Sequence, residues 1–286
     1  MLALVSAAFF GAMTVAIRLG FGRSADARLA SLSMTGTAFA ISFVVAVVAP
    51  HHGDASPAAV WPFAVAGLLS PGLSNFFFAR AIAEAGASRA SVVVGMAPLV
   101  SGVIALTALH EPVRAPLVAG ACLIVLGAAA LVSERTRPAE FRVIGLVLAF
   151  ATTVLFSSRD NLVRWLAGDT GVAPLVASTA TLLGGTLALT VLTFVGREAI
   201  PAQRLRESAR AFFPAGVLFA LSYALLFEAY YRGRVTVVSP LVATESLWGV
   251  TFSAVIIGSS ELIGRRVVAG AALVVAGGVL IGAVAG

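Results

Sequence analysis

One stretch of the sequence occurs twice, and this repeat constrains the possible folds more than any other feature. The run that begins at Glu111, EPVRAPLVAGACLIVLG, is matched by the run that begins at Glu261, ELIGRRVVAGAALVVAG, 150 residues later. Further matched pairs upstream, at spacings of 148 or 146, are Ala81 and Ala229, Ser91 and Ser239, Leu99 and Leu247, Phe10 and Phe156, and Arg18 and Arg164. Self-similarity over most of each half predicts two copies of one unit, residues 1–137 and 138–286.

The composition places both copies in a membrane. Hydrophobic residues make up 59% of the chain and charged residues 11%, whereas soluble domains carry about 25% charged residues. Apolar runs of about 20 residues are membrane-spanning helices, because the bilayer core leaves backbone polar groups no other partner. We predict an all-α integral membrane protein with ten such spans: 2–20, 30–49, 58–83, 89–109, 115–133, 143–166, 173–195, 210–231, 236–257 and 267–285.

Five spans in each copy imply an inverted arrangement. Because five is odd, the second copy must enter the bilayer from the opposite side, as in transporters that bind substrate at the midplane between inverted repeats. Arg is far more frequent in the connections after the odd-numbered spans than in the others. The positive-inside rule places those connections in the cytoplasm and both termini outside.

Other protein classes fit the sequence poorly. The net charge of +6 comes from Arg residues between apolar runs, and the chain lacks the basic stripe and aromatic platform of a nucleic-acid-binding protein. The single Cys122 excludes a disulfide framework, and the three His residues have no metal-ligand spacing. There is no Lys to build a nucleotide-binding loop. We expect no metal and no cofactor. The source of energy would be an ion gradient or the gradient of the substrate itself.

Two local patterns carry a family resemblance. They are Pro98, Glu111, Gly120 and Gly127 in the first copy, and TESLW (244–248) followed by Glu261, Gly270 and Gly277 in the second. With ten helices in two inverted repeats, the chain resembles the EamA-type branch of the drug/metabolite transporter superfamily over nearly its whole length. The second copy departs from the usual pattern, with Ser246 where Pro is common and two extra residues before Glu261. The resemblance implies a multi-pass transporter of the plasma membrane, the inner membrane in a bacterium. The relatives that we would compare with this chain keep both termini in the cytoplasm, which conflicts with its Arg distribution.

Charged residues within the spans are the first candidates for a site, since each costs about 2.5–3.5 kcal/mol or more at the bilayer centre unless it faces a cavity or a partner. Glu245 lies near the middle of the span 236–257, with Trp248 one turn further on. It could bind a substrate amine or carry a coupling proton, or form a structural ion pair with a buried Arg.

Arg159 and Asp160 lie within the span 143–166. Adjacent side chains on a helix point about 100° apart, so we expect each of them to find its partner on another helix or in water. Arg159 could hold a carboxylate and Asp160 a cation or a proton. The alternative is that Arg159 extends to the membrane surface.

Two pairs of equivalent positions add polar candidates. Arg80 and Glu228 have opposite charges near the ends of their spans, and could meet across the axis between the copies or lie in the solvated interface. Asn75 and Tyr223 lie deeper and suit the wall of a polar cavity.

Four further residues have structural interpretations. The carboxylates of Glu111 and Glu261 are placed to cap the helices that follow them. Pro71 and Pro98 predict interruptions of their helices, as hinges or as fixed kinks.

These features favour a secondary transporter that exports small organic metabolites. Amino acids or related compounds are the first choice of substrate, because an acid and an Arg could hold both ends of a zwitterion. Efflux of cationic or lipophilic drugs coupled to protons is the alternative.

An intramembrane enzyme would need a nucleophile, a metal pair or a cofactor motif, and the carboxylates are scattered. A channel or receptor is a third class. We expect a small-molecule substrate and the lipid bilayer as partners and no nucleic acid. Both a monomer and a homodimer are compatible with the sequence.

Overall fold

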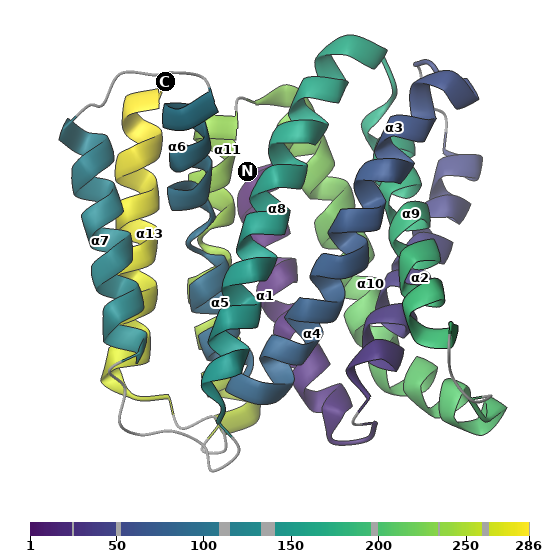
Figure 1. The fold of residues 1–286 in the computed structure, drawn as a ribbon, viewed down its shortest axis with the longest axis horizontal. Coiled ribbons are helices and arrows are strands. Elements are labelled where there is room, and N and C mark those ends of the chain that lie inside the picture. Colours follow the sequence, from purple (N-terminus) through teal and green to yellow (C-terminus); the bar gives the residue numbers. More distant parts are fainter. Residues whose placement is uncertain are drawn as a thin grey trace.

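The computed structural model describes residues 1–24, 26–49, 53–108, 115–132, 141–195, 200–233, 235–258 and 263–285, and all regular elements in these ranges are helices (Figure 1). Seven helical segments in this part of the chain are long and apolar enough to cross a membrane: 2–21, 27–48, 57–85, 143–170, 174–194, 202–232 and 238–257. Shorter apolar helical stretches cover 87–100 and 118–127. The predicted all-helical, multi-pass class is confirmed, whereas ten spans in two inverted repeats remains a prediction.

The first half of the chain contains α1 (Leu2–Phe21), α2 (Ala27–Val48), α3 (Pro57–Gly67), η1 (Leu68–Leu73), α4 (Ser74–Ala85), α5 (Ala87–Val94), α6 (Ala97–Ala108) and α7 (Ala115–Val132). The second half contains α8 (Val143–Thr170), α9 (Pro174–Phe194), α10 (Ala202–Arg232), α11 (Val235–Val242), α12 (Glu245–Phe252), η2 (Ser253–Ile257) and α13 (Arg265–Ala285). Local chemistry explains several helix starts. The Asp26 side chain accepts hydrogen bonds from the first-turn N–H groups of α2, and proline opens both α3 and α9.

Helix α10 is longer than the sequence predicted. It begins at Ala202 rather than at residue 210, inside the segment 196–210 that we expected to be a polar connection. In this first part Ser208 and Ala211 are buried at a spacing of three, whereas the charged residues around them are exposed, so the segment forms a helix with one face in water.

Three of the predicted spans are interrupted. In the span 58–83, Ser70 has extended backbone angles (φ −146°, ψ 115°) directly before Pro71, which confirms the interruption expected there. The span 89–109 breaks at residues 95–96, and the span 236–257 breaks at 243–244, between α11 and α12. Pro98 lies in the first turn of α6, just after its break.

The two breaks occupy equivalent positions in the repeat and lie against each other. Residues 95 and 243 are related by the spacing of 148. A Cβ added to Gly95 would lie 2.8 Å from the Ser246 Cβ and 3.2 Å from the Ala243 carbonyl oxygen. Glycine at 95 therefore lets the two interrupted segments approach each other closely.

Helix packing follows the repeat. Helix α1 packs along α10, and its equivalent α8 packs along α4, the equivalent of the second half of α10. Side-chain contacts repeat as well: Ser6 of α1 bonds to Ser222 of α10, and Thr152 of α8 donates to the Ser74 carbonyl of α4. Ser6 and Thr152 are equivalent positions of the two copies, and so are Ser222 and Ser74. The second contact is therefore the counterpart of the first.

Helices α7 and α13 pack side by side at one edge of the bundle (Figure 1). A Cβ on Gly120 would lie 2.6 Å from the Gly277 carbonyl oxygen, and a Cβ on Gly127 would lie 2.7 Å from that of Gly270. The contacts run in opposite directions along the two helices, so the helices are antiparallel. Small residues allow this close approach within a membrane.

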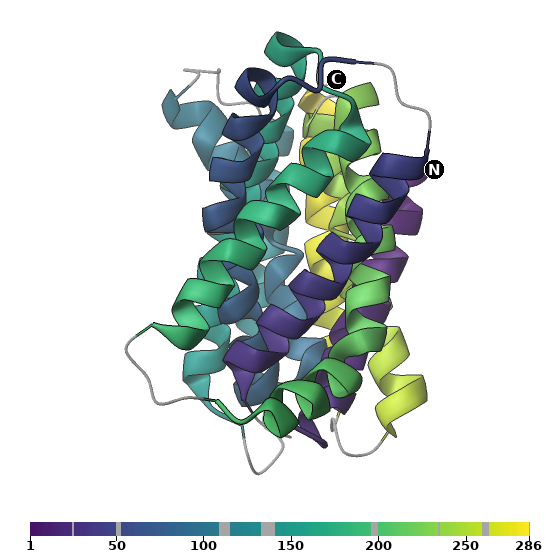
Figure 2. The same cartoon turned by 90° about the vertical axis from the view of Figure 1, so that its right-hand side faces the viewer.

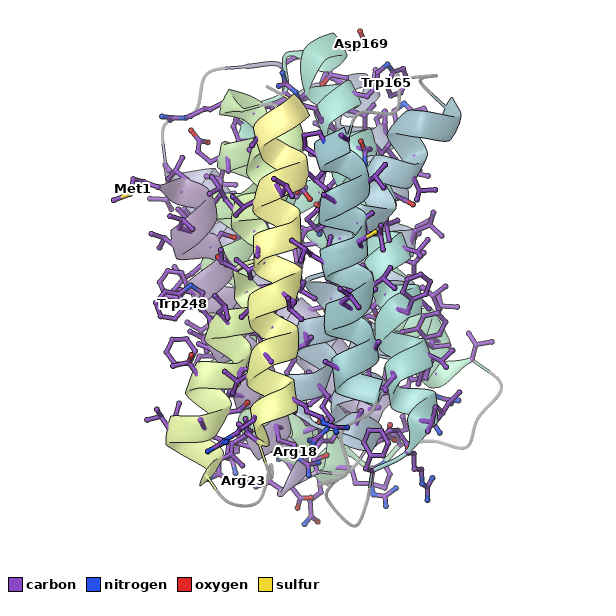
Figure 3. All side chains as sticks on the ribbon, turned by 90° about the vertical axis from the view of Figure 1, so that its left-hand side faces the viewer. Met1, Arg18, Arg23, Trp165, Asp169 and Trp248 are labelled. Atoms are coloured by element: carbon purple, nitrogen blue, oxygen red, sulfur yellow. The ribbon has the colours of Figure 1, made fainter. Side chains whose placement is uncertain are left out.

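The bundle has two chemically different ends. Both chain termini lie toward the same end (Figures 1 and 2). Figure 3 places Arg18 and Arg23 at the opposite end from Trp165 and Asp169. The Arg-rich connection between α1 and α2 therefore lies away from the termini, as the predicted topology requires.

Candidate functional site

The two copies enclose a small cavity inside the bundle, with a volume of about 30 Å³. Its walls come from α1, α5, α6, α8, α10, α11 and α12: Ser6, Phe10, Val94, Ala97, Phe156, Arg159, Asp160, Phe219, Ser222, Tyr223, Leu226, Val242 and Glu245. This volume is close to the share of one water molecule in the liquid. In this structure the cavity is therefore too small for an organic molecule.

Equivalent positions of the two copies face each other across this cavity. Phe10 and Phe156 are repeat mates, and their rings meet edge to face with centroids 5.9 Å apart. Ala97 in the first copy corresponds to Glu245 in the second, and both line the cavity. Part of the wall is thus built from matching positions of the two copies, and the charged groups on it come from the second copy alone.

Arg159 and Asp160 form a buried ion pair with each other. The Arg159 Nε–H donates to Asp160 Oδ1 at 2.8 Å, and an Nη2–H donates to the same oxygen. Our expectation that adjacent residues could not pair was wrong, because the long Arg side chain turns back to reach its neighbour's carboxylate. The second carboxylate oxygen accepts from the Tyr230 hydroxyl of α10 at 2.8 Å.

Aromatic rings also hold the Arg159 guanidinium. Its Cζ lies 5.0 Å from the centroid of the Tyr223 ring and 5.3 Å from that of Phe156. These distances suit cation–π attraction, which strengthens where water is excluded. Arg159 is 6% exposed and lines the cavity, so the alternative in which it extends to the membrane surface is wrong.

Glu245 is the first residue of α12, directly after the break, and it is 4% exposed. Within the residues that the structure describes, its carboxylate has no hydrogen bond and no ion pair. The positive end of the α12 dipole lies beside it and favours a negative charge. Arg159, the buried Arg that could have neutralised it, is paired with Asp160 instead. With Glu245 ionised, these three side chains carry one net negative charge.

Tyr223 and Asn75 are repeat mates in different surroundings. Tyr223 lines the cavity, and its hydroxyl lies near Thr181 and Arg159 without forming a hydrogen bond of good geometry to a described residue. Asn75 is fully buried away from the cavity lining, and it donates to the Thr35 hydroxyl at 2.9 Å.

Trp248 does not line the cavity. Its Cβ lies against Gly11 of α1, and its ring stacks on Phe252 with centroids 5.5 Å apart. The side chain is 39% exposed, on the outer surface of the bundle (Figure 3). The sequence interpretation placed it beside Glu245, but packing against α1 turns it away.

Arg80 and Glu228 do not meet. Arg80 pairs with Glu84 at 3.4 Å on its own helix, and Arg232 donates from Nε to Glu228 at 2.6 Å on α10. The partner of each lies one turn away, and neither residue lines the cavity. We had predicted that Arg80 and Glu228 either meet across the axis between the copies or lie in the solvated interface, and these contacts agree with the solvated interface.

Sequence reasoning missed three residues of the site. Tyr230 is 70 residues from Asp160 in the chain, so only the packing of α10 on α8 brings them together. Ser6 and Ser222 each donate to the other's carbonyl oxygen, at 2.8 and 2.9 Å. A serine in an apolar helix is too common to mark such a contact. Glu111 and Glu261, expected to cap helices, lie outside the described residues.

Comparisons with known proteins agree with this architecture. Residues 1–133 match the EamA-like transporter family, which confirms the resemblance over the first copy. A solved structure titled only "Crystal structure of protein" covers 98% of this chain and 94% of its own, with a TM-score of 0.61 and 20% identity. At this identity the likeness shows the fold alone. No curated protein matches the sequence.

Proposed function

We propose that this EamA-like protein is a secondary transporter that exports small organic amines by alternating access around the central cavity. The observation that carries the proposal is Glu245, a buried carboxylate on the cavity wall that forms no ion pair or hydrogen bond with the residues that the structure describes. Ionisable groups inside membrane proteins usually mark the path of a substrate or a proton. Glu245 would bind the amine and, in its absence, the coupling proton.

The packing symmetry supports alternating access. The antiparallel Gly120–Gly277 and Gly127–Gly270 contacts exchange with each other when the copies are exchanged. Inverted copies give a protein two equivalent ways to tilt around one site. The interrupted segments that cross at Gly95 and Ser246 give it places where helices can bend beside that site.

Two classes of amine would suit the charges on the cavity wall once the cavity widens. An amino acid would place its ammonium on Glu245 and its carboxylate on Arg159, whose guanidinium has five N–H donors, of which Asp160 occupies two. An organic cation would need Glu245 and the aromatic walls alone. Because Asp160 already neutralises Arg159, we place cationic amines ahead of amino acids.

Transport into proteoliposomes tests the proposal. Radiolabelled amino acids and fluorescent organic cations are compared with and without an imposed pH gradient, for the wild-type protein and for Glu245→Gln, Arg159→Ala and the control Glu228→Gln. We expect Glu245→Gln to lower gradient-driven cation transport about tenfold or more, as loss of a charge-assisted contact predicts. Glu228 lies outside the cavity, so its variant should transport normally.

The other outcomes separate the alternatives. Transport of amino acids that is lost in both Glu245→Gln and Arg159→Ala would favour the zwitterion. Unchanged transport of every substrate by a correctly folded Glu245→Gln protein would overturn the role of Glu245. Current that does not saturate with substrate would indicate a channel.

A further inference from the structure

A second and much larger pocket lies at the Arg-rich end of the bundle, with a volume of about 640 Å³. It lies between the α1–α2 connection, the end of α4 and the beginning of α10, and Figure 3 shows Arg23 of its wall at this end. The charged residues of its wall are Arg23, Arg28, Arg80, Arg204, Asp26, Glu84 and Glu207. The volume falls within the range of small-molecule sites.

The acidic residues of this pocket already have partners. Asp26 accepts two backbone N–H groups of α2, and Glu84 lies 3.4 Å from both Arg80 and Arg142. Glu207 accepts from the Gln203 side chain at 2.8 Å.

Three guanidinium groups therefore face the pocket without a carboxylate partner among the described residues. They belong to Arg23 in the α1–α2 connection, Arg28 in the first turn of α2 and Arg204 near the start of α10. Arg28 lies over the Phe76 ring with its Cζ 5.9 Å from the centroid, which fixes one of these groups beside an apolar surface. With four Arg and three acidic residues in its wall, the pocket carries one net positive charge, which favours an anion.

The pocket also lies at the depth of lipid headgroups. Arg23 follows the end of the apolar span 2–21, and Arg28 is in the first turn of the span 27–48. The first turns of α10 carry exposed Arg residues, and Phe213 further along is 55% exposed. Basic residues next to exposed apolar ones are typical of a segment at the membrane surface.

We propose that this pocket binds the phosphate of an anionic phospholipid headgroup, held by Arg23, Arg28 and Arg204. A guanidinium can bind phosphate with two parallel hydrogen bonds, and basic pockets between membrane helices on the cytoplasmic side are suited to anionic lipids. By the Arg distribution, this end faces the cytoplasm. A lipid bound here would tie the start of α10 to the α1–α2 connection and to α4.

Native mass spectrometry of the detergent-purified protein tests the site. The wild-type protein and the variants Arg28→Gln, Arg204→Gln and Arg28→Gln/Arg204→Gln are titrated with phosphatidylglycerol and with phosphatidylcholine. Arg232→Gln is the matched control, because it removes an exposed Arg at the other end of α10. We expect one phosphatidylglycerol to bind more tightly than phosphatidylcholine, and each pocket variant to weaken it by about tenfold.

A second titration distinguishes the sources of phosphate. Inorganic phosphate and glycerol 3-phosphate are added to lipid-free protein, and thermal unfolding is followed. Stabilisation by these soluble anions that equals stabilisation by phosphatidylglycerol would overturn the lipid assignment in favour of a soluble anion. Equal retention of phosphatidylglycerol by the wild-type and double-variant proteins would overturn the pocket altogether, and native spectra report that binding even if a variant is less stable.

Discussion

The ion pair between Arg159 and Asp160 gives the strongest prediction about stability. Their side chains are 5% and 9% exposed, so solvent screens the pair little. Removing one partner of a buried pair costs about 3–5 kcal/mol, because the other charge remains buried without compensation. Asp160→Leu also removes the acceptor of the Tyr230 hydroxyl. We expect Asp160→Leu and Arg159→Met each to lower the free energy of unfolding by about 3–5 kcal/mol.

The double variant Arg159→Met/Asp160→Leu should lose clearly less than the sum of the single variants. A coupling energy of about 2–3 kcal/mol is expected for residues in direct contact. The assay is equilibrium unfolding in mixed detergent micelles, followed by the fluorescence of the three Trp residues. The control is the ion pair of Arg142 and Glu84, which is 3.4 Å long and has its Arg side chain 72% exposed. It should show a coupling below about 1 kcal/mol.

Additive losses from Arg159→Met and Asp160→Leu would refute the reasoning. They would mean that the two charges are solvated independently in the protein. Arg159 would then be free to bind a substrate carboxylate, and amino acids would again precede cations as the expected substrates.

Three further substitutions test the packing and the site. Gly184→Ala would place a methyl group against the α3 backbone, so we expect a large drop in the yield of folded protein, measured by size-exclusion chromatography. Gly168→Ala is the control and should fold normally, because a Cβ added there has no neighbouring atom within 4 Å. Tyr230→Phe removes a hydrogen bond to the Asp160 carboxylate, and should lower the free energy of unfolding by about 1.5–3 kcal/mol in the same micelle assay. Trp248→Ala changes a side chain on the outer surface. The rate of substrate uptake should therefore stay within about twofold of wild type, a free-energy change of roughly 0.4 kcal/mol. A loss as large as the one expected for Glu245→Gln would place Trp248 in the transport path.

The helical, multi-pass class was readable from the sequence, since long apolar runs are a local property of the chain. Pro71 also marked a real interruption. The break in the second copy could not be predicted in this way. Ala243 and Thr244 are ordinary residues within an apolar run, and the break there accompanies the close crossing of two segments at Gly95.

The site was predictable as a set of charges but not as a geometry. Burial cost identified Glu245, Arg159 and Asp160, and all three line one cavity. Which acid pairs with Arg159 depends on rotamers, and no sequence pattern favoured Asp160. Tyr230 joins the cluster only through the packing of α10 on α8, so no local pattern could reveal it.

The central claim, that the two copies alternate around the cavity, is tested most directly by accessibility from the two sides of the membrane. Ala97, the repeat mate of Glu245 on the cavity wall, is replaced by Cys in a Cys122→Ala background, which removes the one native thiol. A membrane-impermeant thiol reagent is then applied to either side of oriented vesicles, with and without substrate. The account predicts labelling from both sides, with substrate raising one rate as it lowers the other. Labelling from one side alone under all conditions would contradict it.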